Sequence, residues 1–294
     1  MTRKTKNPTR SSGYVFVLSA VSIWAVSSGI LVKLISVSAF TLYAVGAFWA
    51  ILFLLIALAA KRKLVDLLSY PRKTLWLMLA VGLGVAINNG LFFTAIKTGT
   101  VANAVLTHYL APLLVVLVFG PVILKEKITS RRIVLSAVGF LGLFVLIYPD
   151  LGRSVDPALI YGTLSAIFFA FHTSLEKMVT QTKIDSLSAV VYKNIVPLVV
   201  FLPFAIRSIS AGISPDNWFW MTIWGILVLG VSFILYFQGI KRISAASASN
   251  LSYGEPIGAI ALAAIFFREP VSLYTIIGGL LIIASGIGVV RARS

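Results

Sequence analysis

The sequence predicts an all-α integral membrane protein with ten transmembrane helices, arranged as two inverted repeats of five helices. Three observations lead to this prediction. Of the 294 residues, 59% are hydrophobic and only 12% are charged, whereas about a quarter of the residues in a soluble globular protein are charged. Ten apolar runs approach the roughly 20 residues that cross a bilayer as a helix. Finally, a stretch of the first half recurs in the second half.

The composition also excludes several classes of function. The net charge of +16 comes from basic residues clustered between apolar runs, with no continuous basic stripe, so no nucleic-acid partner is expected. The chain has no cysteine and two histidines. Disulfides, thiolate metal sites and cysteine nucleophiles are therefore excluded, and we expect neither a metal site nor a cofactor.

The ten helices follow from apolar runs bounded by charged residues, Pro or Gly clusters. The first run continues well past the length of a signal-peptide core, so we interpret it as a retained helix. The alternation of polar and apolar residues that marks a transmembrane barrel is missing from the sequence. The predicted helices cover residues 13–32, 38–59, 74–95, 99–122, 131–149, 158–177, 187–206, 218–239, 244–267 and 271–290.

The basic residues predict the orientation of the chain, because Lys and Arg are enriched in short cytoplasmic loops. With a cytoplasmic N-terminus, most of the 25 Lys and Arg residues fall on the inner side, and Lys193 lies within a helix. We therefore expect a multi-pass protein of the bacterial inner membrane with both termini in the cytoplasm. The residues left on the outer side are Lys33, Lys97, Arg153, Arg207 and Arg268.

The internal repeat pairs residues 91–112, LFFTAIKTGTVANAVLTHYLAP, with residues 235–256, LYFQGIKRISAASASNLSYGEP, without a gap. Helices 3 and 4 thus correspond to helices 8 and 9. Since five is an odd number of crossings, the second five-helix unit must enter the membrane upside down. Such inverted repeats are the architecture of carriers that open alternately to either side. Ala111 stands where the second repeat has Glu255, so the two halves contribute unequally to any site.

The chain resembles a known family at several of these residues. The segment from Leu235 to Val290 is similar to the end of an EamA domain of the drug/metabolite transporter superfamily, with Glu269 before the last helix and glycines at Gly278 and Gly286. IWAVSSGILVKL near the start is similar to the family's first helix, and KEKIT after helix 4 matches the glutamate of REP after helix 9.

This resemblance implies two EamA repeats, which the apolar runs divide at a short connection. It is specific for the fold and much less so for the substrate, because the family includes exporters of amino acids, amines, nucleotides and other metabolites. The predicted parts are a cytoplasmic tail at 1–12, a first repeat at 13–150, a second repeat at 157–290 and a tail at 291–294.

Glu255 is the most informative polar residue, because a charge at the centre of a spanning helix costs about 2.5 to 3.5 kcal/mol on insertion scales. It lies about 11 residues into the ninth predicted helix, between Gly254 and Pro256. We expect either a partner for a substrate ammonium or a proton acceptor. The alternative is a protonated carboxyl, hydrogen-bonded to a neighbouring helix, that helps position a kink.

Further polar and aromatic residues lie deep in apolar runs and predict a lined cavity. Asn88 and Asn89 are adjacent on one helix, so we expect one to face the cavity and the other a neighbouring helix. Lys193 could snorkel to the cytoplasmic side, or meet a substrate carboxylate or Glu255. The predicted lining residues are Trp24, Asn88, Tyr109, Tyr253 and Glu255. Possible substrate or proton contacts, with hydrogen-bonded packing as the alternative for the histidines, are His108, His172 and Lys193.

Two further patterns concern the shape of the helices. Pro112 and Pro256 occupy equivalent places in the repeats, where each removes a backbone hydrogen bond, so we expect kinked helices with gate hinges. Trp218, Trp220 and Trp224 cluster at the start of the eighth predicted helix, as in an interfacial anchor.

The predicted function is secondary transport of a small organic metabolite, with export or exchange of an amino acid or amine favoured. No Walker sequence occurs, so the chain is not expected to hydrolyse ATP. An enzyme is not expected, because Glu255 has no second deep acid and the other acids lie in loops or at helix ends. The alternative is a flippase or exporter of lipids or drug-like amphiphiles. The expected partners are a small-molecule substrate and the lipid bilayer, with the protein as a monomer or homodimer.

Overall fold

The computed structural model describes residues 8–125, 129–150, 155–179, 182–240, 242 and 251–291. These residues form helices, and no strand occurs among them. The first part of the chain contains α1 (Pro8–Val26), the π-helix η1 (Ser27–Leu31), α2 (Val32–Leu34), α3 (Ala39–Ala60), the 3-10 helix η2 (Leu64–Leu68), α4 (Arg72–Thr98), α5 (Val101–His108), α6 (Ala111–Leu114), the π-helix η3 (Val115–Phe119), α7 (Gly120–Leu124), α8 (Ser130–Ile147) and the 3-10 helix η4 (Tyr148–Asp150).

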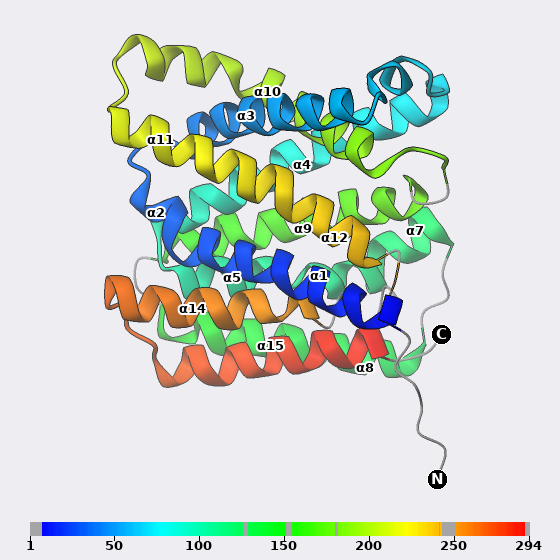
Figure 1. The fold of residues 1–294 in the computed structure, drawn as a ribbon. Helices are drawn as coiled ribbons and strands as arrows, with labels where there is room; N and C mark the ends of the chain where they lie inside the picture. Colours follow the sequence, from blue (N-terminus) through cyan, green and yellow to red (C-terminus); the bar gives the residue numbers. More distant parts are fainter. Residues whose placement is uncertain are drawn as a thin grey trace.

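The remaining helices complete a bundle whose members run roughly along one direction (Figure 1). They are α9 (Pro157–Val179), α10 (Ser186–Ser210), α11 (Pro215–Trp224), the π-helix η5 (Gly225–Val231), α12 (Ser232–Ile240), α14 (Gly254–Phe267) and α15 (Leu273–Arg291). Helices suit an apolar surrounding because they satisfy their backbone hydrogen bonds internally.

Local sequence signals explain where several helices begin. Ser38, Thr100, Thr129, Asp185 and Ser214 each precede a helix, and each side chain accepts a hydrogen bond from a backbone N–H of the first turn. These residue types are the preferred N-caps, because a short oxygen-bearing side chain satisfies a donor that has no partner within the helix. The caps therefore define the ends of the bundle.

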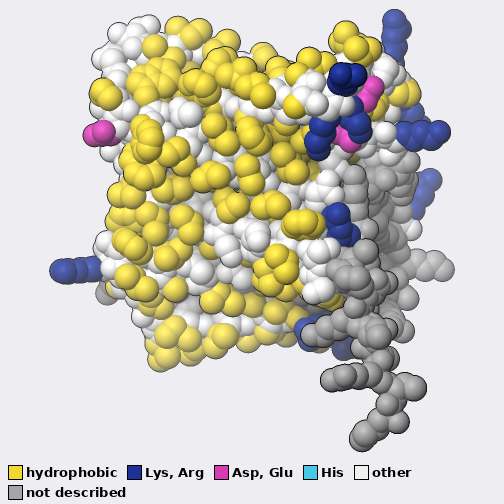
Figure 2. All heavy atoms as spheres, viewed as in Figure 1, with side chains coloured by type: hydrophobic (Ala, Val, Ile, Leu, Met, Phe, Trp, Pro, Cys, Tyr) yellow, Lys and Arg dark blue, Asp and Glu magenta, His cyan; other side chains and the backbone are white. Residues whose placement is uncertain are grey.

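Among the described residues, six helical segments are long and apolar enough to cross a membrane, and two shorter helices are apolar too. Large apolar side chains are exposed along the bundle, and Figure 2 shows them covering most of the face in view. Together these features describe a multi-pass membrane protein. The six segments are 11–34, 39–60, 72–98, 157–176, 186–210 and 215–239, and the shorter helices are 254–267 and 273–288.

The helices lie in layers, with α3 packed on α10 along one side and α8 packed on α15 along the other. Between these pairs, α4 packs on α9, and α1 packs on α12 and α14. We call the end of the bundle where α1 begins and α15 ends the near end, and the opposite end the far end (Figure 1). Most Lys and Arg side chains in the view of Figure 2 gather at the near end.

Two predicted helices are broken where a continuous kinked helix was expected. In the first repeat, α5 ends at His108 and α6 begins at Ala111. In the second, Tyr253 lies in a turn and α14 begins at Gly254, while much of the preceding predicted stretch lies outside the described residues. Pro112 and Pro256 therefore each fall in the first turn of a new helix, where the missing N–H has no helical partner to lose.

The predicted tryptophan anchor is wrong for one of its three members. Trp224 is fully buried, and its Nε1 donates a hydrogen bond to Ser27 Oγ at 2.8 Å. Its ring also packs edge-on against Tyr43 and Phe93. Trp224 therefore belongs to the interior, because the preceding residues Pro215–Trp224 already form more than two helical turns.

Candidate functional site

A cavity of about 130 Å³ lies among α1, η1, α4, α5, α9, α10, η5, α12 and α14. Its lining residues reach toward both ends of the bundle, and Ser28 and Phe93 lie six and five residues before the far ends of α2 and α4. Among its lining residues, Glu176 lies three residues before the end of α9, and Tyr236 lies four residues before the end of α12. Seven of the eight residues predicted as substrate or proton contacts line the cavity: Trp24, Asn88, His108, Tyr109, His172, Lys193 and Glu255.

Glu255 is held at the cavity by two hydroxyl groups from different helical segments. Ser28 Oγ donates to Glu255 Oε1 at 2.9 Å, and Tyr109 OH donates to Glu255 Oε2 at 2.8 Å. Glu255 is 7% exposed and stands in the first turn of α14. The carboxyl group is therefore hydrogen-bonded to neighbouring helices and at the same time borders the cavity, so it can act on a bound molecule.

Aromatic side chains form one wall of the cavity around Trp24. Its indole Nε1 donates to Ser232 Oγ at 2.7 Å, which supplies the partner that a deep indole requires. The ring centroid lies 5.5 Å from that of Phe233 and 5.1 Å from that of Tyr236. Such a wall suits a flat or cationic molecule, because aromatic faces attract positive charge.

Lys193 meets an acid that the sequence analysis had placed among helix-end residues. Lys193 is 4% exposed, and its Nζ lies 2.7 Å from Glu176 Oε1 and 3.8 Å from the centroid of the Phe233 ring. Two predictions are corrected. Lys193 neither snorkels nor meets Glu255, and a second acid, Glu176, does line the cavity. Glu176 was missed because its position near the end of α9 gave no sign that it turns inward.

The two histidines have different surroundings. His108 Nδ1 lies 2.8 Å from Ser165 Oγ, and the ring stacks on Phe92 with centroids 4.1 Å apart. His172 Nδ1 lies 3.4 Å from Glu176 Oε1, and its Nε2 has no hydrogen-bond partner among the described residues. His108 is thus a packed, hydrogen-bonded residue, whereas His172 retains a polar atom that a ligand can use.

Asn88 and Asn89 both line the cavity, which corrects the expectation that only one would do so. Asn88 Nδ2 donates to Asn89 Oδ1 at 3.1 Å, and Asn89 Nδ2 donates to Tyr43 OH at 3.3 Å. The chain of amides turns both side chains to the same side of α4. Asn88 is 3% exposed, and its Oδ1 has no partner within the described part of the chain.

Tyr253 is the one predicted contact that is not among the cavity-lining residues. Its hydroxyl lies against Gly286 of α15, where an added Cβ would be only 1.5 Å from the Tyr253 oxygen. The ring centroids of Tyr109 and Tyr253 are 5.5 Å apart, so Tyr253 packs against Tyr109, which lines the cavity. This packing explains one of the glycines noted in the sequence.

Metal binding has no support in the described residues, because no group of three or more His, Cys, Asp or Glu side chains is placed to hold an ion there. The polar groups of the cavity instead come from α1, η1, α4, α5, α9, α10, α12 and α14, together with Tyr109 in the turn after α5. They offer carboxylate, amide, imidazole and ammonium groups to a small molecule.

A bundle of apolar helices around a partly polar cavity is the architecture expected of a membrane transporter. The chain belongs to the EamA-like transporter family, whose model matches residues 11–148 and again 156–291. The protein is therefore a transporter of the drug/metabolite transporter superfamily and not an enzyme.

Relatives of known sequence are also transporters. The chain is 25% identical over 210 residues to "Uncharacterized transporter YxxF" of Bacillus subtilis (strain 168), covering 70% of this chain and 67% of the relative. It is 28% identical over 206 residues to the S-adenosylmethionine uptake transporter of Rickettsia prowazekii (strain Madrid E), covering 69% and 66%. A solved crystal structure matches with a TM-score of 0.66 at 21% identity, covering 96% of this chain and 98% of that one, which supports the fold.

Proposed function

We propose that this protein is a secondary transporter that exports or exchanges a small organic metabolite, with an amino acid or amine favoured, across the plasma membrane by alternating access. The observation that carries the proposal is the Glu255 carboxyl, buried at the wall of a cavity in a chain of this transporter family. Burying such a group is costly unless it has a task or partners, and here it has both a cavity and two donors.

The helix contacts support the proposed arrangement of ten helices as two inverted five-helix repeats. If the second repeat begins at α9, contacts should occur in equivalent pairs, and they do. The packing of α4 on α9 corresponds to that of α12 on α1, and the packing of α5 on α9 corresponds to that of α14 on α1. The pairs α3 with α10 and α8 with α15 each join equivalent helices. The breaks before Pro112 and Pro256 are the proposed hinges.

The distribution of charge supports a cytoplasmic near end. The loops there carry clusters such as Lys61, Arg62 and Lys63, all exposed. At the far end, Arg207 and Arg268 are exposed, whereas Lys33 and Lys97 are partly buried and engaged in hydrogen bonds, so fewer free basic side chains lie there. Because Lys and Arg in short loops favour the cytoplasmic side, this distribution supports the proposal that both termini lie in the cytoplasm.

The charges in the cavity favour a substrate that carries a positive charge. Glu255 and Glu176 are acids, Lys193 is engaged by Glu176, and the lining therefore has one carboxyl in formal excess. Asn88 Oδ1 adds an acceptor without a partner among the described residues. An ammonium group that donates to these oxygens and lies against Trp24 fits this surrounding better than an anion does.

A second candidate is uptake of a sulfonium compound such as S-adenosylmethionine. Two relatives are named S-adenosylmethionine uptake transporters, from Rickettsia prowazekii (strain Madrid E) and Rickettsia conorii (strain ATCC VR-613 / Malish 7). The aromatic wall formed by Trp24, Phe233 and Tyr236 suits a sulfonium cation and an adenine ring. A lipid or drug-like amphiphile remains the third possibility.

The first test is a thermal-shift screen of the purified protein in detergent with amino acids, amines, nucleosides, sugars and S-adenosylmethionine. A ligand that binds only the folded state at 100 times its Kd stabilises it by about 2.7 kcal/mol. We expect cationic compounds to raise the Tm of the wild type, and Glu255→Gln to lose most of this shift. Asp66→Asn, in the near-end helix η2, is the matched control and should keep it. Stabilisation by anions alone would contradict the proposed substrate class.

A further inference from the structure

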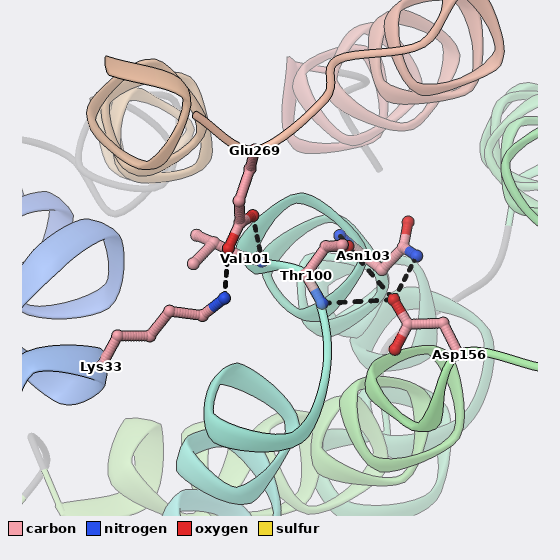
Figure 3. A network of polar contacts seen from close by, with 6 residues as sticks. All are labelled: Lys33, Thr100, Val101, Asn103, Asp156 and Glu269. Carbon is pink, nitrogen blue, oxygen red and sulfur yellow. Dashed lines mark hydrogen bonds and ion pairs between the residues drawn. The ribbon is translucent and has the colours of Figure 1, made fainter. Parts of the chain in front are cut away.

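A network of charged and polar groups joins four segments at the far end of the bundle (Figure 3). Lys33 of α2 forms an ion pair with Glu269, which lies between α14 and α15. Glu269 Oε2 also accepts a hydrogen bond from the backbone N of Val101, the first residue of α5, at 2.8 Å. The side chains of Lys33 and Glu269 are only 22% and 11% exposed, so this pair is screened less than a surface pair.

A second carboxylate holds the same start of α5 from the opposite side. Asp156 Oδ2 accepts from the backbone N and Oγ1 of Thr100, each at 3.2 Å, and from Asn103 Nδ2 at 2.7 Å. Asp156 Oδ1 accepts from the N of Ala158 at 2.9 Å, which ties this acid to the start of α9. The first turn of α5 is therefore fastened to both neighbouring segments (Figure 3).

A third contact closes the same end. Lys97, in the last turn of α4, donates from Nζ to the carbonyl oxygens of Val32 and Ile35 at 2.7 and 2.6 Å. These carbonyls lie at the end of α2, where helical partners are lacking. The far ends of α2, α4, α5, α9 and α14 are thus linked by side chains, and this network lies between the cavity and the far end of the bundle.

The helices α5 and α14 are joined at both of their ends. At the cavity, Tyr109 follows α5 and bonds to Glu255 of α14, and at the far end Val101 of α5 bonds to Glu269. The chain turns back after α14, with the N of Glu269 near the carbonyl oxygen of Ala263 at 3.5 Å. Eight residues separate Val101 from Tyr109 and Glu255 from Ala263, and each interval is about 12 Å at 1.5 Å per residue.

We propose that the Glu269 and Asp156 network is the far-end gate of the transporter, and that the Tyr109 to Glu255 hydrogen bond holds this gate closed through the paired helices α5 and α14. Glu269, Lys33 and Asp156 are positioning residues in this scheme. The inference rests on the proposed alternating access. A bond that exists only in the closed state favours that state by its own net free energy. A molecule or proton that displaces the Tyr109 hydroxyl from Glu255 therefore weakens the contact between α5 and α14. The free-energy cost of opening the far end is then lower.

The test uses cysteine labelling, for which the chain is suited because it has no cysteine of its own. Val228→Cys, on the cavity wall in η5, reports access to the cavity. Ala211→Cys, exposed after α10 at the far end, identifies which face of a vesicle is the far face. A membrane-impermeant trimethylammonium methanethiosulfonate is applied to each face of membrane vesicles, and the rate of labelling is measured.

We expect Val228→Cys to react faster from the near face than from the far face. Adding Glu269→Gln or Lys33→Met should raise the far-face rate about tenfold, since loss of one charge-assisted bond shifts an equilibrium by about that factor. The double variant Lys33→Met/Glu269→Gln should raise the far-face rate by less than the product of the two single-variant increases, because both substitutions remove the same ion pair. The matched control is Asp185→Asn, because Asp185 also pairs with a lysine, Lys63, and caps a helix, but at the near end.

The link through α5 has its own matched pair of variants. Tyr109→Phe removes the Glu255 bond from α5, whereas Ser28→Ala removes the other Glu255 bond, which comes from η1. Tyr109→Phe should raise far-face labelling and Ser28→Ala should not. Equal rates from both faces in the Val228→Cys parent, or an unchanged far-face rate in Glu269→Gln and Lys33→Met, would overturn the gate. A response to Ser28→Ala equal to that of Tyr109→Phe would overturn the link through α5.

Labelling needs no substrate, so this experiment separates the gate from the proposed function. If the gate variants change far-face labelling but no tested compound binds or is transported, the gate stands and the proposed substrate class fails. If transport is found while far-face labelling stays constant, the proposed function stands and the gate fails. A variant that does not fold is recognised by its elution in gel filtration, and Asp156→Asn, which acts on the same helix start, then replaces it.

Discussion

Two hydroxyl donors hold the Glu255 carboxyl, one on each oxygen, and each oxygen keeps a second lone pair for a proton or a ligand. Glu255→Gln keeps the size of the side chain but removes its charge and its ability to exchange a proton. We expect transport to fall about tenfold and its pH dependence to flatten, because a charge-assisted contact is worth about 1.5 to 3 kcal/mol. The measurement is flux into proteoliposomes across a range of pH, at equal protein content.

Asp66→Asn is the control for this prediction, since Asp66 lies in the near-end helix η2, away from the cavity. It should leave both the rate and the pH profile unchanged. If Glu255→Gln retains the rate and pH profile of the wild type, the carboxyl serves only to hold Ser28 and Tyr109 in place.

The Glu176 and Lys193 pair gives a second prediction for single residues. Lys193→Met leaves Glu176 without its cation in a poorly hydrated place, and breaking a buried pair in this way costs about 3 kcal/mol. The double variant Lys193→Met/Glu176→Gln should regain most of that loss, because neither charge is then left alone. Thermal unfolding in detergent checks this, and a double variant no more stable than Lys193→Met would show that the pair does not act as a unit.

The sequence predicted some of these residues for clear physical reasons. Glu255 and Trp24 stand far from any helix end, so their polar atoms required an internal partner or a ligand. Glu176 and Glu269 stand near helix ends, where a charged side chain usually reaches water, and only the turn of the backbone brings them inward. Lys193 was recognised as unusual, yet its partner depends on how α9 and α10 meet, which a single sequence does not show.

Close contact between helices depends on glycines at matching positions in α3 and η5. A Cβ added at Gly225 would lie 2.3 Å from the carbonyl oxygen of Gly46, so Gly225→Ala must push η5 away from α3. Such overpacking typically costs 1 to 3 kcal/mol. We expect a lower Tm in detergent by thermal unfolding. Gly254→Ala is the control, since its Cβ would meet only Val21 at 3.4 Å, an ordinary contact, and an equal loss in both variants would contradict this view.

The sequence predicted the ranges that form helices, but it did not predict the irregular segments within those ranges. Apolar length indicates where the chain forms helices, and helix is found within every predicted interval. It does not reveal the π-helices η1, η3 and η5, or the turns after His108 and at Tyr253. These depend on contacts such as Asn194 Nδ2 with the carbonyl oxygen of Leu229, at 3.3 Å, which joins α10 to η5. Local irregularities of this kind are frequent at functional sites.

The two ends of the bundle differ, and this difference appears only when several helices are considered together. The polar network of Lys33, Glu269 and Asp156 lies at the far end, and its ion pair is less exposed than the Lys63 and Asp185 pair at the near end. The composition and the repeat predicted a two-sided carrier. They did not predict the far-end network, because it depends on side chains from four separate segments meeting in space.

The orientation of the molecule in the membrane is a prediction that two exposed loops can test. Ser69→Cys lies before α4 at the near end, beside the basic cluster that starts at Lys61, and Ala211→Cys lies at the far end. Because Lys and Arg in short loops are retained on the cytoplasmic side, intact cells should be labelled by an impermeant thiol reagent at Ala211→Cys and not at Ser69→Cys. Permeabilised cells should be labelled at both, which controls for the reactivity of each thiol. The reverse pattern would place the basic loops outside the cell. Labelling of both positions in intact cells would mean that the chain inserts in two orientations. Either result would contradict the assignment of the near end to the cytoplasm.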